Sequence, residues 1–215
     1  MKSVLVIGLG RFGRHLCLKL TQLGNEVMIV DKDEAAVTEL ANSVTSAQIA
    51  DCTDEAALHA LGVPNFDVCF VCIGSDFASS LLITSMLKDL GAQRIIAKSS
   101  QDMHTRLLLR NGADEVVYPE RDSAERVAMR TSATNVFDYI ELTDDHAIFE
   151  TAVPASWVGK TIVELAVRQK YRINVLATKQ GGRLEPLPGP THCFRADETI
   201  FVLGSNRDVQ RFLNL

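Results

Sequence analysis

The sequence predicts an α/β protein: a Rossmann-like, doubly wound parallel sheet, followed by a small α+β C-terminal lobe. Short apolar runs alternate with longer amphipathic stretches from Val4 to Thr131, which is the pattern of strands joined by helices on both faces of a parallel sheet. After Thr131 this alternation stops, and short strand-like runs with glycine- and proline-containing turns follow. We therefore expect a nucleotide-binding domain over residues 1–135 and a second domain over 136–215.

Six strand–helix units make up the expected first domain. Its strands are short apolar runs, and several of its helices end at a glycine, a residue common just after helix C-termini. The predicted strands are 4–7, 26–30, 47–50, 67–73, 94–97 and 115–118. The predicted helices are 11–23, 33–40, 53–61, 75–90, 101–110 and 119–131. Parallel strands with right-handed crossovers give the doubly wound order of a dinucleotide-binding sheet.

The expected second domain has fewer recognisable elements. Strands are predicted at 147–153, 174–178 and 199–203, and a short helix at 161–168. A turn at 180–183 and a proline-rich loop at 186–190 separate the last two strands. The acidic stretch 138–145 is interpreted as a solvated surface or a hinge.

Composition excludes several classes of protein. The chain has 215 residues with a formal net charge of −5, so no basic field attracts nucleic acid. No apolar run reaches the roughly 20 residues of a membrane span, and the N-terminus lacks the features of a signal peptide. We therefore expect a cytoplasmic protein with reduced cysteines. Cys69 and Cys72 should point to opposite faces of one strand, which disfavours a shared metal or disulfide.

The strongest motif is the run Gly8-Leu9-Gly10-Arg11-Phe12-Gly13, which has G-x-G-x-x-G spacing. It follows a buried strand and opens a helix, as in dinucleotide-binding proteins. The glycines allow a tight turn, close approach of a diphosphate to the backbone, and close packing of helix on strand. Asp31 ends the next strand and can accept hydrogen bonds from a ribose. The alternative is a set of turn glycines beside an acidic helix cap.

Arg11 departs from the small or apolar residues that oxidoreductases usually carry in this loop. Its guanidinium can bind a phosphate through two hydrogen bonds, which suggests a ligand with more phosphate charge than a nicotinamide dinucleotide. The alternative is a solvated arginine in the first helical turn.

Further candidates follow the other strands, since ligands bind beyond the carboxyl ends of a parallel sheet. Asp51 could receive the adenine amine, Gly74 could let a base or ribose lie on the backbone, and Lys98 could meet a phosphate. Taken alone, each is more often a cap or a solvated loop residue, but their position at a common edge favours a joint role in a site. The candidates at this edge are Asp31, Lys32, Asp51, Cys52, Ile73, Gly74, Ser75, Lys98, Ser99, Ser100, His104 and Glu120.

Glu120 would repel phosphates unless a cation lies between them. Carboxylate and phosphate oxygens are suitable ligands for a divalent ion. A carboxylate in the first turn of a helix is also favoured by the helix dipole, so the residues alone leave both roles open.

Together these motifs resemble the RCK (TrkA-N) domain, followed by a TrkA-C-like lobe. The resemblance is carried by the glycine loop, Asp31, Ile73-Gly74, and the segments 112–114, 118–122, 135–136, 139–140 and 167–171. It covers nearly the whole chain and is strongest to the KtrA type, the regulatory subunits of Ktr potassium uptake systems. Those proteins have one RCK unit, whereas TrkA carries two.

The resemblance implies a homo-octameric ring at the inner face of the membrane, bound to an integral-membrane potassium channel subunit of the KtrB type. It implies that ATP activates and ADP inhibits at the Rossmann site, with NAD(H) as a further ligand. Arg11 would contact terminal phosphates in its own or a neighbouring subunit, and Phe12 and Gly13 belong to the same loop motif. Glu120 would bind Mg²⁺ or Na⁺, and 98–100 with His104 would complete the pocket.

Some family members bind cyclic di-AMP between two C-terminal lobes. Ile162, Val163 and Arg168 fit that pattern, but Ala166 stands where a polar residue is common.

Two other functions remain open. A nicotinamide-dependent oxidoreductase would need a proton donor in the second domain, which offers only His146 and His192, neither in a recognisable motif. A redox sensor that binds NADH would need neither Arg11 nor Glu120. Because no acid–base pair, nucleophile or metal cluster accompanies the glycine loop, we expect a regulatory protein and not an enzyme.

Overall fold

The structure is a computed structural model that describes residues 1–132, 136–143 and 145–213. The chain forms two compact units, Met1–Arg121 and Asp122–Leu215, and helix α6 (Pro119–Ser132) spans the boundary between them. The domain boundary expected at Asn135 falls on residues outside the described ranges.

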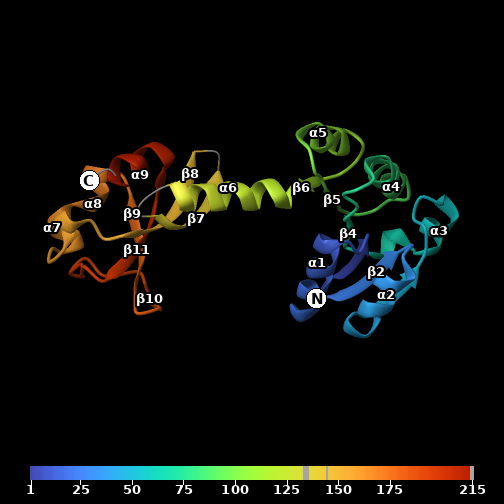
Figure 1. The fold of residues 1–215 in the computed structure, drawn as a ribbon, viewed down its shortest axis with the longest axis horizontal. Coiled ribbons are helices and arrows are strands. Elements are labelled where there is room, and N and C mark those ends of the chain that lie inside the picture. Colours follow the sequence, from blue (N-terminus) through green and yellow to red (C-terminus); the bar gives the residue numbers. More distant parts are fainter. Residues whose placement is uncertain (133–135, 144, 214–215) are drawn as a thin grey trace. The chain divides into compact units, whose positions relative to one another are not determined.

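The first unit is a six-stranded parallel sheet in the order β3-β2-β1-β4-β5-β6, drawn blue to green in Figure 1. This order confirms the predicted doubly wound fold. Its strands are β1 Ser3–Ile7, β2 Glu26–Asp31, β3 Ser46–Ile49, β4 Val68–Val71, β5 Ile95–Lys98 and β6 Glu115–Val117. Its helices are α1 Arg11–Gln22, α2 Glu34–Leu40, α3 Glu55–Ala60, α4 Phe77–Asp89 and α5 Asp102–Arg110, with 3-10 turns at Ala41–Ser43 and Val63–Asn65.

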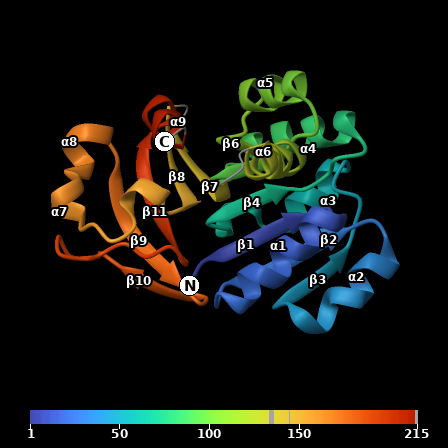
Figure 2. The same cartoon turned by 60° about the vertical axis from the view of Figure 1, so that its left-hand side comes forward.

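Helices cover both faces of this sheet, as Figure 2 shows. Successive residues of β1 alternate between two cores: Leu5 and Ile7 pack with residues of α3, α4 and α5, and Val4 and Val6 with residues of α1 and α2. Burial on both faces explains why the strands are continuous apolar runs.

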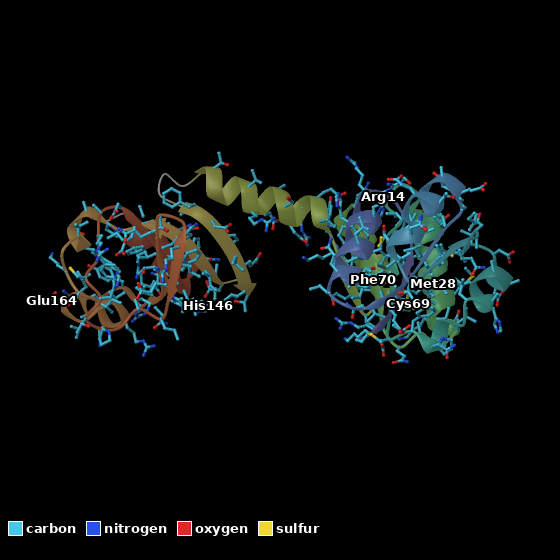
Figure 3. All side chains as sticks on the ribbon, turned by 90° about the horizontal axis from the view of Figure 1, so that it is seen from below. Arg14, Met28, Cys69, Phe70, His146 and Glu164 are labelled. Atoms are coloured by element: carbon cyan, nitrogen blue, oxygen red, sulfur yellow. The ribbon has the colours of Figure 1, made fainter. Side chains whose placement is uncertain are left out.

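Cys69 and its neighbour Phe70, both labelled in Figure 3, belong to opposite cores, and so do Cys69 and Cys72. The prediction that these two cysteines point to opposite faces is therefore confirmed.

Aspartates start three helices of the first unit. The carboxylates of Asp33, Asp54 and Asp76 accept hydrogen bonds from the first-turn N–H groups of α2, α3 and α4. Two predicted starts are therefore wrong. Thr53 does not cap α3, because its hydroxyl donates to Asp51 Oδ1 at 2.7 Å, and α4 begins two residues later than the expected Ser75.

The second unit contains a five-stranded antiparallel sheet in the order β10-β9-β11-β8-β7, drawn yellow to red in Figure 1. Its strands are β7 Val136–Thr143, β8 His146–Ala152, β9 Asn174–Gln180, β10 Arg183–Pro186 and β11 Glu198–Ser205. Its remaining helices are α7 Ile162–Leu165, α8 Val167–Tyr171 and α9 Asn206–Leu213, with a 3-10 turn at Ala155–Trp157. The fully buried Trp157 lies in its core beside Phe194 and Phe212.

This unit departs from the prediction at four places. The stretch 138–145, interpreted as a solvated surface or a hinge, is largely exposed where it is described, but residues 138–143 form part of strand β7, and the half-buried Tyr139 packs against the core. Strand β10 and helix α9 were not predicted. The expected helix 161–168 is two short helices, separated at Ala166, which has a left-handed φ of 46°. Within the described residues, no helix is long and apolar enough to cross a membrane.

Candidate nucleotide-binding site

The glycine loop joins β1 to α1, and its geometry explains two of the three glycines. Gly8 has a φ of +96°, a conformation that L side chains rarely adopt. A Cβ on Gly13 would lie 2.0 Å from the carbonyl oxygen of Gly8, so the close packing of α1 on β1 requires a glycine there. The loop is therefore built as the motif predicts.

Gly10 is different, because the protein itself has no need for a glycine at this position. A Cβ on Gly10 would meet no atom within 4 Å, and its φ of −63° is open to any residue. Gly10 is also the N-cap of α1, whose first turn contains no acidic residue. The open space above Gly10 therefore faces the amide groups at a helix N-terminus, where an anion is favoured.

Asp31, at the end of β2, lies next to this loop. One carboxylate oxygen accepts a hydrogen bond from the Leu9 N–H at 2.6 Å, and the other accepts from the Asp33 N–H at 3.0 Å. Each oxygen retains a second lone pair. Asp31 thus holds the glycine loop to β2 and can still accept from a ribose hydroxyl.

A cleft at this edge of the sheet brings together nine of the predicted site residues: Gly8, Gly10, Asp31, Lys32, Asp51, Cys52, Ile73, Gly74 and Ser75. Eight further residues line it that were not predicted as site residues: Ile7, Val30, Ala50, Thr53, Cys72, Asp76, Ser79 and Ile83. Among these, Asp76 could have been found from the sequence, since an aspartate shortly after the fourth strand is a common N-cap of the helix that follows.

The other predicted residues of the loop and of the β5 end do not line this cleft. Arg11 begins α1 and is exposed, and Phe12 packs against the core beneath α1 and α2. Ser99 is buried, and its hydroxyl donates to the Gln101 carbonyl at 2.8 Å. Ser100 is half-buried, and the His104 ring stacks on Phe77 with 3.7 Å between centroids.

Lys98 and Glu120 form an ion pair at the carboxyl end of β5. The distance from Lys98 Nζ to Glu120 Oε1 is 2.7 Å. This hydrogen bond, with a smaller contribution from the charge of Arg11, lowers the pKa of Glu120. Within the described residues, no cluster of three or more His, Cys, Asp or Glu side chains could hold a metal ion. A cation at Glu120 would therefore need oxygens from a ligand, as the phosphates of a nucleotide supply them.

The polar groups of the cleft are suited to binding and not to nucleophilic chemistry. Hydrogen bonds from Thr53 lower the pKa of Asp51, so this carboxylate is a hydrogen-bond acceptor at neutral pH. Burial raises the pKa values of Cys52 and Cys72 to about 12, which leaves both thiols protonated and unreactive.

Comparison with known structures identifies the fold. The chain superimposes on the RCK domain of GsuK with a TM-score of 0.70 and 19% identity, covering 100% of this chain and 47% of that one. The GsuK channel bound to NAD gives a TM-score of 0.71 with 20% identity, and the match covers 96% of this chain and 38% of the channel chain. The chain thus spans less than half of these longer proteins.

Comparison with known sequences identifies the family. The TrkA-N domain model matches residues 4–119, and the TrkA-C domain model matches residues 147–215. The chain is 41% identical to Ktr system potassium uptake protein C of Bacillus subtilis, over 98% of this chain and 96% of the relative. It is 37% identical to Ktr system potassium uptake protein A of the same organism, over 99% and 96% respectively.

These relatives are potassium uptake proteins and not enzymes, which agrees with the absence of catalytic motifs from the sequence. Three findings agree on the family. The TrkA-N domain model covers the glycine-loop cleft, the TrkA-C domain model follows it, and the relatives match along nearly their whole length. The chain therefore belongs to the TrkA-N/TrkA-C family of Ktr potassium uptake proteins.

Proposed function

We propose that the chain is the nucleotide-sensing regulatory subunit of a potassium uptake channel, activated by ATP and inhibited by ADP. The observation that carries this proposal is the unfilled space above Gly10 at the N-terminus of α1, in a chain whose relatives are potassium uptake proteins. A regulator needs two ligands that favour different conformations, because only a difference in affinity can shift the equilibrium.

In this proposal, each side of the cleft binds one part of the nucleotide. The adenosine lies along Asp51-Cys52 and Ile73-Gly74-Ser75, and Asp31 accepts from its ribose. The phosphates lie at Gly10 and the start of α1, where Arg11 reaches the terminal phosphate of its own or a neighbouring subunit. The segment 98–100 and His104 complete the site, and Glu120 shares a Mg²⁺ or Na⁺ ion with the phosphates.

The partner proposed for this subunit is an integral-membrane potassium channel protein of the KtrB type. The names of the relatives support a role in potassium uptake, and no described helix can cross a membrane. We therefore place the protein at the inner face of the cell membrane, assembled as a homo-octameric ring beneath its partner, with no role for nucleic acid.

NAD(H) is the second candidate ligand, and an NADH sensor the second candidate function. One structural neighbour, the GsuK channel, is described as bound to NAD, and Asp31 would suit either ribose. Arg11 and Glu120 favour the triphosphate, because they add a phosphate ligand and a cation ligand beyond what a dinucleotide needs.

Cyclic di-AMP is proposed as a ligand of the second unit, at Ile162, Val163 and Arg168. Val163 is 64% exposed although apolar, and the Arg168 Nε donates to Asn174 Oδ1 at 2.7 Å. An exposed aliphatic side chain can pack against a base, and a guanidinium can bind a phosphate. Ala166, the left-handed C-cap of α7, departs from the family pattern, because its methyl side chain offers no polar contact to such a ligand.

The test is competition binding together with potassium flux. Calorimetry of the full chain with ATP and Mg²⁺, repeated in the presence of ADP, should show one shared site. With the membrane partner reconstituted in vesicles, ATP should raise potassium flux above the level in ADP. If neither nucleotide binds, or if flux is the same in both, the regulatory function proposed here is wrong.

A further inference from the structure

We propose that Lys98 is a displaceable counter-ion for Glu120. Before a nucleotide binds, the Lys98 ammonium forms an ion pair with the Glu120 carboxylate. When a nucleotide brings a cation to Glu120, the lysine is released and donates to the phosphates. This inference rests on the proposed nucleotide site and adds an exchange step to it. It starts from the ion pair itself, in which Nζ and Oε1 are 2.7 Å apart.

Gly74 explains how the lysine reaches this position. A Cβ on Gly74 would lie 3.2 Å from Lys98 Nζ and 3.7 Å from Cδ and Cε, so the lysine side chain lies alongside the glycine. Gly74 also lines the cleft. Gly74, which we interpreted as a place for a base or ribose, therefore also leaves room for the Lys98 side chain. The ammonium consequently lies at the border of the nucleotide site.

The two partners differ in how exposed they are. The side chain of Lys98 is 13% exposed, whereas that of Glu120 is 58% exposed. A hydrated cation can therefore reach Glu120 directly from solvent. The lysine stays at the cleft border, so it needs only a change of partner and not a long movement to meet a phosphate oxygen.

Charge balance gives the direction of the exchange. Lys98 pairs with Glu120 directly, and the charge of Arg11 acts on the same carboxylate more weakly. Nucleotide phosphates add several negative charges, which attract both cations and repel Glu120. A divalent ion removes that repulsion by binding the carboxylate and phosphate oxygens together, and a lysine ammonium is a good point charge for phosphate.

The exchange also changes a link between two elements. Lys98 is the last residue of β5, and Glu120 is the second residue of α6. The ion pair ties the edge of the nucleotide site to the first turn of the helix that continues into the second unit. When a cation replaces Lys98 at Glu120, this link between β5 and α6 is broken. The first turn of α6 therefore responds to the ligand that is bound in the cleft.

The test is calorimetry of ATP binding to the full chain with and without Mg²⁺, using Glu120→Gln, Lys98→Met and the double variant. The matched control is Arg94→Met, which removes an exposed ion pair to Glu115 at the opposite end of β5. Circular dichroism checks that each variant is folded, and Lys98→Gln replaces Lys98→Met if the latter does not fold.

Without Mg²⁺, Glu120→Gln should bind ATP about tenfold more tightly than the unmodified chain, because the released Lys98 adds one charge-assisted hydrogen bond. The double variant should lose this gain, and Arg94→Met should bind like the unmodified chain. A gain of the same size in the double variant would mean that only repulsion by Glu120 was removed. That result, no gain in Glu120→Gln, or an equal gain in Arg94→Met would overturn the proposal. Failure of the unmodified chain to bind ATP would instead contradict the proposed function.

Discussion

Gly10 and Gly13 belong to one motif, but the structure gives them different roles. Gly13 is required by the protein, since its missing side chain lets α1 pack against the Gly8 carbonyl, whereas Gly10 leaves space that nothing in the protein fills. One motif thus combines a folding requirement with a binding requirement, and substitution can separate them.

Gly13→Ala should lower the free energy of unfolding by about 1–3 kcal/mol, because the added methyl group overpacks the contact between strand and helix. Gly10→Ala should cost less stability than Gly13→Ala, because only a helix cap is weakened. It should bind ATP more weakly, since its methyl group enters the space proposed for phosphate. Thermal denaturation and calorimetry of both variants check this. Equal stability of the two variants would contradict the assigned roles.

Arg11 is the residue that distinguishes the proposed triphosphate from a dinucleotide. Arg11→Ala should weaken ATP binding more than NAD binding, because only ATP offers a terminal phosphate for the guanidinium. Competition titrations with the two ligands measure the ratio. Equal losses for ATP and NAD would count against a phosphate role.

The cysteines give a prediction about reactivity. Burial raises the pKa values of Cys52, Cys69 and Cys72 to about 12 and also raises that of Cys17, so at pH 8 these four thiols remain protonated. Cys193 is exposed. A thiol reagent should therefore modify one cysteine per native chain at pH 8 and five after denaturation. Rapid modification of more than one native thiol would contradict the buried packing.

Among elements, the six strand–helix units of the first unit could be predicted from sequence because burial on both faces makes each strand a continuous apolar run. The loop motif and Asp31 then placed the cleft. The rest of the site was harder to predict, because contacts such as Lys98–Glu120 and His104–Phe77 depend on tertiary packing between side chains far apart in sequence.

The second unit was less predictable for two physical reasons. Strand β7 presents one face to solvent, so its acidic residues conceal the buried Val136 and the half-buried Tyr139. Helix α9, by contrast, begins at Asn206 directly after β11, and its start carries a signal that the prediction missed: Gly204 precedes Ser205, whose hydroxyl accepts from the Asp208 N–H at 3.2 Å. Strand β10 is exposed along its length, and therefore lacks an apolar pattern.

Helix α7 starts with a reciprocal capping box, in which the Thr161 hydroxyl accepts from the Glu164 N–H and Glu164 accepts from the Thr161 N–H. Figure 3 labels Glu164. Thr161→Ala should destabilise the second unit by about 1 kcal/mol. Denaturant unfolding followed by tryptophan fluorescence measures this, because Trp157 lies in the core of that unit. An unchanged unfolding midpoint would show that the cap does not stabilise the second unit.

The same cap predicts a pH dependence. Hydrogen bonds from Thr161 lower the pKa of Glu164 below its ordinary value of 4.5. The stabilisation should therefore be complete above pH 4.5 and be lost as the pH falls through the lowered pKa of the folded state. Glu164→Gln should show less acid destabilisation over that window. Parallel pH curves for both proteins would contradict the role of this carboxylate.

At the scale of the whole molecule, helix α6 connects the unit that contains the candidate nucleotide cleft to the second unit. The proposal requires that ATP and ADP occupy the same cleft and favour different assemblies, since a ligand with equal affinity for both states shifts nothing. Glu120 at the start of α6 and Arg11 at the start of α1 are the residues proposed to sense the difference in phosphate charge.

The most direct test is small-angle X-ray scattering of the full chain, with ATP and Mg²⁺ exchanged for ADP in the same sample. The account predicts an oligomer of constant mass whose scattering profile changes with the nucleotide and reverts when it is exchanged back. Identical profiles in both nucleotides, or a monomer at every protein concentration, would contradict the account.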